Sequence, residues 1–290
     1  RSSGGRLRLS LAMADGEFGT QLWAQQFDVQ RIELQRSIDD LVGQLARSLF
    51  VQLFHSAGDR ILRSGPERAS ADDLALRGWS VYFRVLSREN FAESLRLFED
   101  ALAKDPDCVR ALAGVSTASS FGVMLEYLPD KAAALRRADE AAHRLEQLGA
   151  EDWFALTGRV VLANVRHEWQ RMLQLANVMV ERFPNDPTAH QQRSVALMKL
   201  GEFEESLAAA ERAVRFSPRD SRFGLLHLCV ATNQYILERY AEAAESARRM
   251  QALSPNIPLA TPLLAASLAR IGCRAEGEKL MREFLSRSPN

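Results

Sequence analysis

Four prolines divide the carboxyl-terminal part of the chain at nearly even intervals. Pro184 to Pro218 spans 34 residues, Pro218 to Pro255 spans 37, and Pro255 to Pro289 spans 34 again. A period of this length is typical of a helix–turn–helix unit that stacks on its neighbours. The spacing therefore predicts a mainly α-helical solenoid.

The segment 185–218 shows how one unit is built. Asp186 can cap a first helix that has Pro187 at its first position, where the missing N–H costs nothing. Gly201 stands where a helix end needs a left-handed residue. A second helix follows, and its apolar positions recur three or four residues apart on one face: Phe203, Leu207, Ala210 and Val214.

The second helices of the last three units carry small residues at matching positions, counted back from each proline. These residues are Ser206, Ala210, Ala243, Ala247 and Gly277. Helices approach closely only where side chains are small, so we expect contacts between neighbouring helices at these points.

The period, the small residues and the terminal prolines resemble the tetratricopeptide repeat family. The first helix departs from the family's tryptophan, leucine, glycine and tyrosine, with His190, Arg193, Ser194 and Leu197 in their places. Periodicity carries the resemblance, and it implies about six helix–turn–helix repeats over residues 64–290.

Earlier units are less regular. Ser70 and Asp73 resemble a capping box that starts the first unit, and the span from Gly78 to Phe91 predicts a lengthened inner loop. Asp130 is expected to cap a long helix that runs through residue 148 and ends at Gly149.

The amino-terminal segment has a different pattern. Leucine and methionine alternate with other residues over 6–13, which predicts a half-buried strand, and residues 20–27 supply a second strand after a turn at Asp15–Gly16. An amphipathic helix is expected to begin near Asp28. An exposed edge of this hairpin can pair with another chain, so a homodimer is one expected state.

A second resemblance covers this segment. Gly19, Leu22, Trp23, Phe27 and Asp28 look like the carboxyl-terminal half of the TolB amino-terminal-like domain of bacterial signalling proteins. The resemblance implies a partial α/β domain over 1–63 that follows an output domain, either a class III adenylate or guanylate cyclase or a winged-helix DNA-binding domain. A stand-alone scaffold or assembly factor is the alternative.

Net charge and the distribution of apolar residues limit the kinds of partner that we expect the chain to bind. Thirty-seven basic and thirty-seven acidic residues cancel, which leaves no global charge for nucleic acid or an anionic membrane. The uncharged run 254–269 holds three prolines and falls short of the roughly 20 apolar residues that span a bilayer. Three widely spaced cysteines indicate reduced thiols and a cytoplasmic location.

No motif in the sequence indicates catalysis. Phosphate-binding, metalloprotease, CxxC and nucleophile-elbow patterns are all missing, so we expect no catalytic residue, no cofactor and no enzymatic activity in this region. His190 and His227 occupy equivalent places on adjacent first helices. They could form a metal pair, but without a carboxylate or cysteine at ligand spacing we expect them to fill packing positions instead.

Stacked hairpins leave a concave surface lined by first helices, which such arrays use to hold extended protein or peptide segments. Helical phase predicts its lining as Trp79, Tyr82, Phe83, Arg159, Asn164, Gln191, Val195, Lys199 and Tyr235. Alternatively, the three aromatic residues of the first unit pack internally. Some family members clamp a terminal carboxylate with lysines and asparagines, but Gln191 and Val195 stand at two of those places here.

Overall fold

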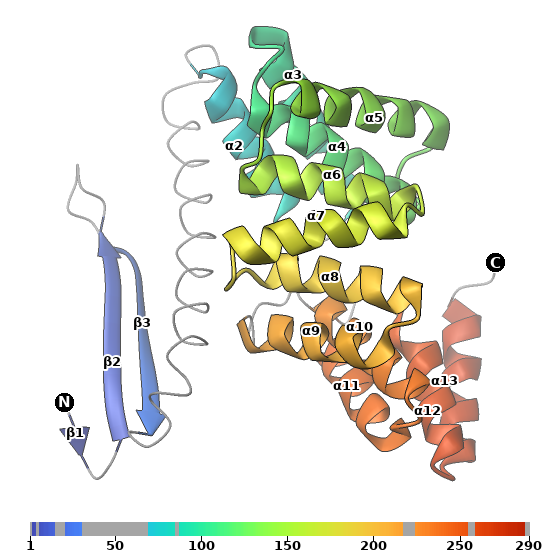
Figure 1. Ribbon diagram of the computed structural model, residues 1–290. Coiled ribbons are helices and arrows are strands. Elements are labelled where there is room, and N and C mark those ends of the chain that lie inside the picture. The colour runs from blue at the N-terminus through green and yellow to red at the C-terminus, as the bar shows by residue number, and fades with distance from the viewer. Residues whose placement is uncertain are drawn as a thin grey trace.

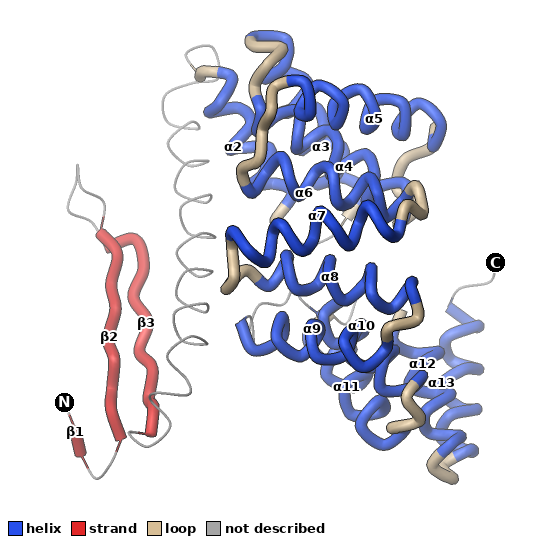
Figure 2. The backbone as a smooth tube through the Cα atoms, in the orientation of Figure 1, coloured by secondary structure: helices blue, strands red, loops and turns tan. Residues whose placement is uncertain are grey.

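The computed structural model describes residues 2–3, 6–14, 21–30, 69–84, 87–216, 224–254 and 259–287. Within these ranges, three strands come first and twelve helices follow (Figure 1). Figure 2 shows the strands standing apart from the helical array. The predicted class, a mainly helical solenoid, is confirmed.

The helices form six successive antiparallel hairpins, each packed on the next (Figure 1). They are α2 (Ala71–Tyr82) with α3 (Arg88–Lys104), α4 (Val109–Met124) with α5 (Lys131–Gln147), α6 (Trp153–Val165) with α7 (Trp169–Arg182), α8 (Pro187–Leu200) with α9 (Phe203–Phe216), α10 (Gly224–Ile236) with α11 (Tyr240–Leu253), and α12 (Ala260–Arg270) with α13 (Arg274–Arg287).

Helix starts follow the capping residues that the sequence contains. Ser70 and Asp73 form a complete capping box at α2, where the Asp73 backbone N–H donates to Ser70 Oγ over 3.1 Å. The Asp130 carboxylate caps α5, and the Asp186 carboxylate caps α8 ahead of Pro187. These caps satisfy backbone N–H groups that have no partner inside their helices.

Helix ends and connections also match expectation. Gly149 and Gly201 adopt φ values of 62° and 90°, the left-handed conformation that glycine accepts without strain. The connection from Tyr82 to Arg88 is longer than the one from Leu200 to Phe203, so the lengthened inner loop of the first unit is confirmed.

Small residues stand where the helices come closest. Ser206, Ala210, Ala243 and Ala247 are all buried, and Ser206 Oγ donates to the Ser194 carbonyl across the α8–α9 hairpin at 2.7 Å. A Cβ added to Gly277 would lie 2.6 Å from the backbone oxygen of Ala265. The predicted contact points are confirmed.

The amino-terminal strands form an antiparallel sheet in the order β1 (Ser2–Ser3), β2 (Arg6–Ala14), β3 (Gln21–Gln30). The hairpin of β2 and β3 confirms the two predicted strands, with Leu9 opposite Phe27. β1 was not predicted.

One boundary in this segment was wrong. Asp28 does not begin a helix, because β2 is long enough for the ladder to continue past it: Arg8 pairs with Asp28 and Arg6 pairs with Gln30. The sheet therefore satisfies the backbone groups that a helix start would have used. The expected helix beyond residue 30 lies outside the described residues and stays a prediction. The division of the chain into domains 1–63 and 64–290 also stays a prediction, because nothing tests it.

Candidate functional site

The first helices of five successive hairpins line one pocket of about 120 Å³. Side chains from α2, α4, α6, α8 and α10 contribute, so residues more than a hundred positions apart meet there. The lining comprises Trp79, Tyr82, Phe83, Arg84, Thr117, Phe121, Trp153, Thr157, Val161, Thr188, Gln191, Gln192 and Leu225.

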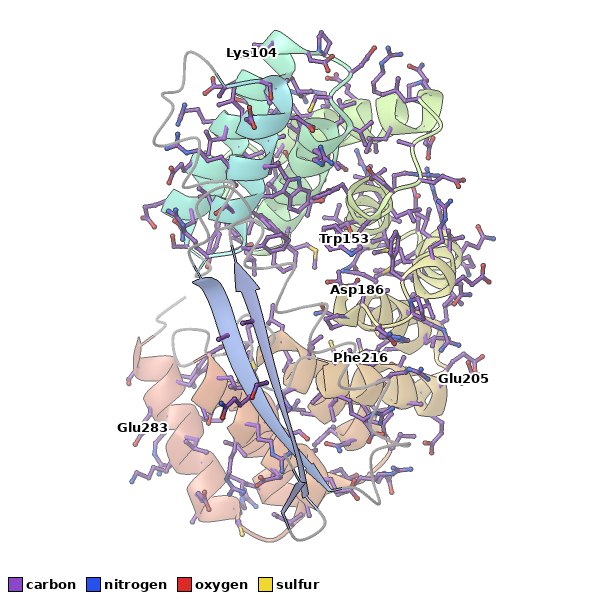
Figure 3. All side chains as sticks on the ribbon, turned by 90° about the vertical axis from the view of Figure 1, so that its left-hand side faces the viewer. Lys104, Trp153, Asp186, Glu205, Phe216 and Glu283 are labelled. Atoms are coloured by element: carbon purple, nitrogen blue, oxygen red, sulfur yellow. The ribbon has the colours of Figure 1, made fainter. Side chains whose placement is uncertain are left out.

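Five of the thirteen lining residues are aromatic, and the two indoles among them are held in place. Trp79 Nε1 donates to the Arg110 carbonyl at 2.9 Å. Trp153 Nε1 donates to Asp186 Oδ2 at 3.0 Å, and Figure 3 labels these two residues. The rings of Trp79 and Trp153 meet edge to face with centroids 5.9 Å apart. Because both N–H groups are satisfied within the chain, these walls are preorganised.

The Asp186 carboxylate has two roles at this point. It accepts the Ala189 backbone N–H at 2.9 Å as the cap of α8, and it accepts the Trp153 indole from α6. The start of one first helix is thereby tied to the aromatic wall supplied by the preceding one.

Some polar atoms of the pocket are hydrogen-bonded within the chain, and others have no partner among the described residues. Thr157 Oγ1 donates to the Trp153 carbonyl at 2.7 Å. By contrast, Thr117 Oγ1 and Gln192 Oε1 are buried without a hydrogen-bond partner among the described residues. Arg84 is the one charged side chain of the described lining, and it is exposed.

Four of the nine residues predicted for the binding face line this pocket: Trp79, Tyr82, Phe83 and Gln191. Trp79 is fully buried, whereas Tyr82 and Phe83 are half-buried. Internal packing, the alternative for these aromatics, therefore describes Trp79 well, while its two neighbours retain surface.

The other five predicted residues lie outside the pocket. Arg159 pairs with Glu146 at 3.4 Å, Lys199 lies over the Trp169 ring, and Tyr235 packs edge-on against Tyr240. Val195 packs against the core, and Asn164 is half-buried near the end of α6. Their role in partner binding stays a prediction.

Several lining residues were missed by helical phase alone. Thr117 and Phe121 are four residues apart on α4, and Trp153, Thr157 and Val161 follow the same spacing on α6. Side chains four apart share a helix face. That spacing was the available signal, but it does not say which face turns toward the pocket.

The two equivalent histidines are packing residues. His190 is buried, its Nε2 lies 2.8 Å from the Pro184 carbonyl, and its ring packs on Phe216. Burial lowers the pKa of His190 and of His227. No cluster of three metal-ligating side chains exists in the part of the chain that the structure describes.

These buried imidazoles should make stability depend on pH. Their pKa values in the folded state lie below the ordinary 6.5, so the unfolded chain binds more protons as the pH falls below about 6.5. The free energy of unfolding should therefore fall between pH 7 and 5.5, and a His190→Gln/His227→Gln variant should lose less over that interval. Urea unfolding at both pH values measures this. Equal slopes for the wild type and the variant would contradict the expectation.

Two further observations concern the cysteines and the lengths of the helices. Cys108, Cys229 and Cys273 are all free thiols. Among the described helices, none is long and apolar enough to cross a membrane.

Comparison with known proteins adds the fold class. No family model and no curated protein matches the chain. Solved structures do: Cut9 in the APC/C hetero-tetramer Cut9–Hcn1 matches with a TM-score of 0.61 at 13% identity, over 83% of this chain and 44% of that one. A human IFIT1 dimer with m7Gppp-AAAA gives 0.56 at 14%, over 80% and 55%. Pseudomonas aeruginosa PilF gives 0.54 at 12%, over 76% and 92%.

At these identities the likeness concerns the fold. Together with the six hairpins, it defines the chain as a tetratricopeptide-type α-solenoid preceded by a β-hairpin. The chain spans about half the length of Cut9 and of IFIT1, and most of the length of PilF.

Proposed function

We propose that this solenoid is a non-catalytic protein-binding module, which holds an extended segment of a partner protein along the face made by its first helices. The aromatic pocket carries the proposal. Binding energy in protein interfaces concentrates where aromatic side chains surround a desolvated pocket. Here five helices converge on such a pocket, and its indole walls are fixed by hydrogen bonds to the chain itself.

Charge supports a protein segment over a nucleic acid. One of the similar structures is a human IFIT1 dimer with m7Gppp-AAAA, and an aromatic pocket can stack a base. Nucleic-acid binding also needs several cations to neutralise phosphates. The described lining supplies Arg84 alone, so a neutral or weakly acidic peptide fits better.

The wider role we propose is regulation of an output domain in a bacterial signalling protein in the cytoplasm. The support is the resemblance of Gly19, Leu22, Trp23, Phe27 and Asp28 to a TolB amino-terminal-like domain, and the observed hairpin of β2 and β3 fits it. A cyclase is the first choice for the output and a winged-helix regulator the second. A stand-alone scaffold is the alternative, and homodimerisation through the hairpin edge belongs to the same proposal.

The gene sequence upstream of Arg1 tests the cyclase, winged-helix and stand-alone alternatives directly, because it would encode cyclase aspartates, a recognition helix or neither.

Selection of peptides on the immobilised protein tests the binding function. Peptides recovered from a random phage library should bind in solution, as measured by fluorescence polarisation, and Tyr82→Ala should weaken them at least tenfold. Tyr82 is half-buried at the pocket, so the variant should still fold. Gln174→Ala, an exposed change on the second helix α7, is the control and should have no effect.

The possible results of this experiment test the position of the site and the binding function separately. Peptides that bind Tyr82→Ala as tightly as the wild type would contradict the placement of the site in this pocket. A library that yields no binder would contradict the function itself.

A further inference from the structure

The pocket contains two buried polar atoms that nothing within the described chain satisfies. Thr117 is 1% exposed, lines the pocket, and its hydroxyl has no hydrogen-bond partner. Gln192 lies on α8 and is partly buried, and its Oε1 atom is also buried without a hydrogen-bond partner among the described residues. Buried polar groups are nearly always paired in folded proteins, and an orphan costs about 1–3 kcal/mol. Two of them in one pocket indicate what an occupant must supply.

The walls define the rest of the occupant. A volume of about 120 Å³ is close to the cavity of roughly 150 Å³ that accepts a benzene ring. Tyr82, Phe83 and Phe121 are half-buried and present apolar surface, which favours an aromatic ring packed edge to face. The occupant is therefore one six-membered ring with a small polar group.

A cationic occupant is disfavoured. Aromatic walls also suit a quaternary ammonium group, which relies on the negative faces of the rings. The one charged side chain of the described lining is Arg84, which repels such a cation, and no carboxylate of the described residues lines the pocket to offset it.

We infer that this pocket takes the side chain of a tyrosine in the partner segment. A phenol hydroxyl both donates and accepts, so it can donate to Gln192 Oε1 and accept from the Thr117 hydroxyl. It would serve the Gln192 amide in either orientation of that side chain. Phenylalanine would leave both atoms unpaired, and a tryptophan N–H would donate to one and accept from neither. This inference rests on the proposed function, since it names the residue that the proposed partner inserts.

Small side-chain analogues test the pocket without a known partner. We would titrate the full chain with p-cresol, toluene and 4-methylanisole and follow methyl-labelled NMR spectra, in which Val161 and Leu225 report on the pocket. p-Cresol should bind and shift these methyl signals. Toluene lacks the hydroxyl and 4-methylanisole lacks the donor, so each should bind about fivefold or more weakly.

A matched pair of threonine variants assigns the hydrogen bond. Thr117→Val replaces an unpaired hydroxyl by a methyl group of the same shape, so the fold should be retained and p-cresol affinity should drop about fivefold, because one of its two hydrogen bonds is lost. Thr157→Val is the control: it lines the same pocket, but its hydroxyl already bonds the Trp153 carbonyl, so p-cresol affinity should not change.

Equal affinity for p-cresol and toluene, no binding of either, or no effect of Thr117→Val would overturn the inference. Library peptides that bind through Tyr82 but carry no tyrosine would overturn it as well, while leaving the proposed function intact. Binding of p-cresol by a protein that selects no peptide would have the opposite meaning: the pocket chemistry stands and the peptide-binding function fails.

Discussion

Replacing Trp79 by alanine should lower the free energy of unfolding by about 3–5 kcal/mol, the range for deleting a large buried aromatic side chain. Trp79 is fully buried, and its ring packs against Tyr82, Phe98 and Trp153 at centroid distances of 5.4, 5.5 and 5.9 Å. The substitution also leaves the Arg110 carbonyl without the indole N–H that it accepts at 2.9 Å. Urea unfolding followed by circular dichroism measures the loss.

Two companion variants separate the components. Trp79→Phe keeps an aromatic ring but not the N–H, so it should cost less than alanine. Tyr82→Ala should also cost less, because Tyr82 is only half-buried. If Trp79→Ala were to unfold at the wild-type urea concentration, Trp79 could not be the buried wall that the structure shows.

This result bears on how the binding face was predicted. Trp79, Tyr82 and Phe83 stand at positions i, i+3 and i+4 and share one helix face, so the sequence placed all three near the groove. It could not tell which of them supports the wall and which retains surface, because that depends on α4 and α6. The decisive contacts of Trp79, with Trp153 and with the Arg110 carbonyl, join residues 74 and 31 positions away.

The hairpins were predictable because their signals are local. Asp186, Pro187 and Gly201 specify the bounds of α8 by capping and backbone conformation alone, and the 34-residue period repeats the pattern. The bound at Asp28 failed for the opposite reason, since pairing with Arg8 across the sheet decides it.

The hardest feature to predict from the sequence was which side chains of the solenoid reach the binding groove. Arg159 and Lys199 have the right phase for the groove, yet Arg159 pairs with Glu146 from α5 and Lys199 covers the Trp169 ring of α7. Long charged side chains reach the nearest opposite charge or aromatic face, and helical phase does not reveal which is nearer. Thr117 and Gln192 were missed because an unpaired buried atom can be recognised only after its neighbours are known.

The second large effect concerns how the first two hairpins fit together. Phe98 of α3 is fully buried, and its ring lies against Gly78 of α2 and Gly114 of α4. A methyl group added at either glycine would overlap the ring. Phe98→Ala should therefore cost about 3–5 kcal/mol, because it empties the space that both glycines leave for it.

The same geometry predicts that the effect of Gly114→Ala on the free energy of unfolding changes sign between the wild type and the Phe98→Ala variant. In the wild type, overlap with Phe98 should cost about 1–3 kcal/mol, which exceeds the gain of about 1 kcal/mol from replacing a helical glycine. In the Phe98→Ala background the overlap is gone, so Gly114→Ala should stabilise the protein by about 1 kcal/mol. A double-mutant cycle from urea unfolding measures the coupling. If the fold does not tolerate Phe98→Ala, Phe98→Leu should show the same trend with a smaller amplitude. Additive effects would mean that Gly114 is small for some reason other than the ring, and that the α2–α3–α4 contact is not set by this aromatic side chain.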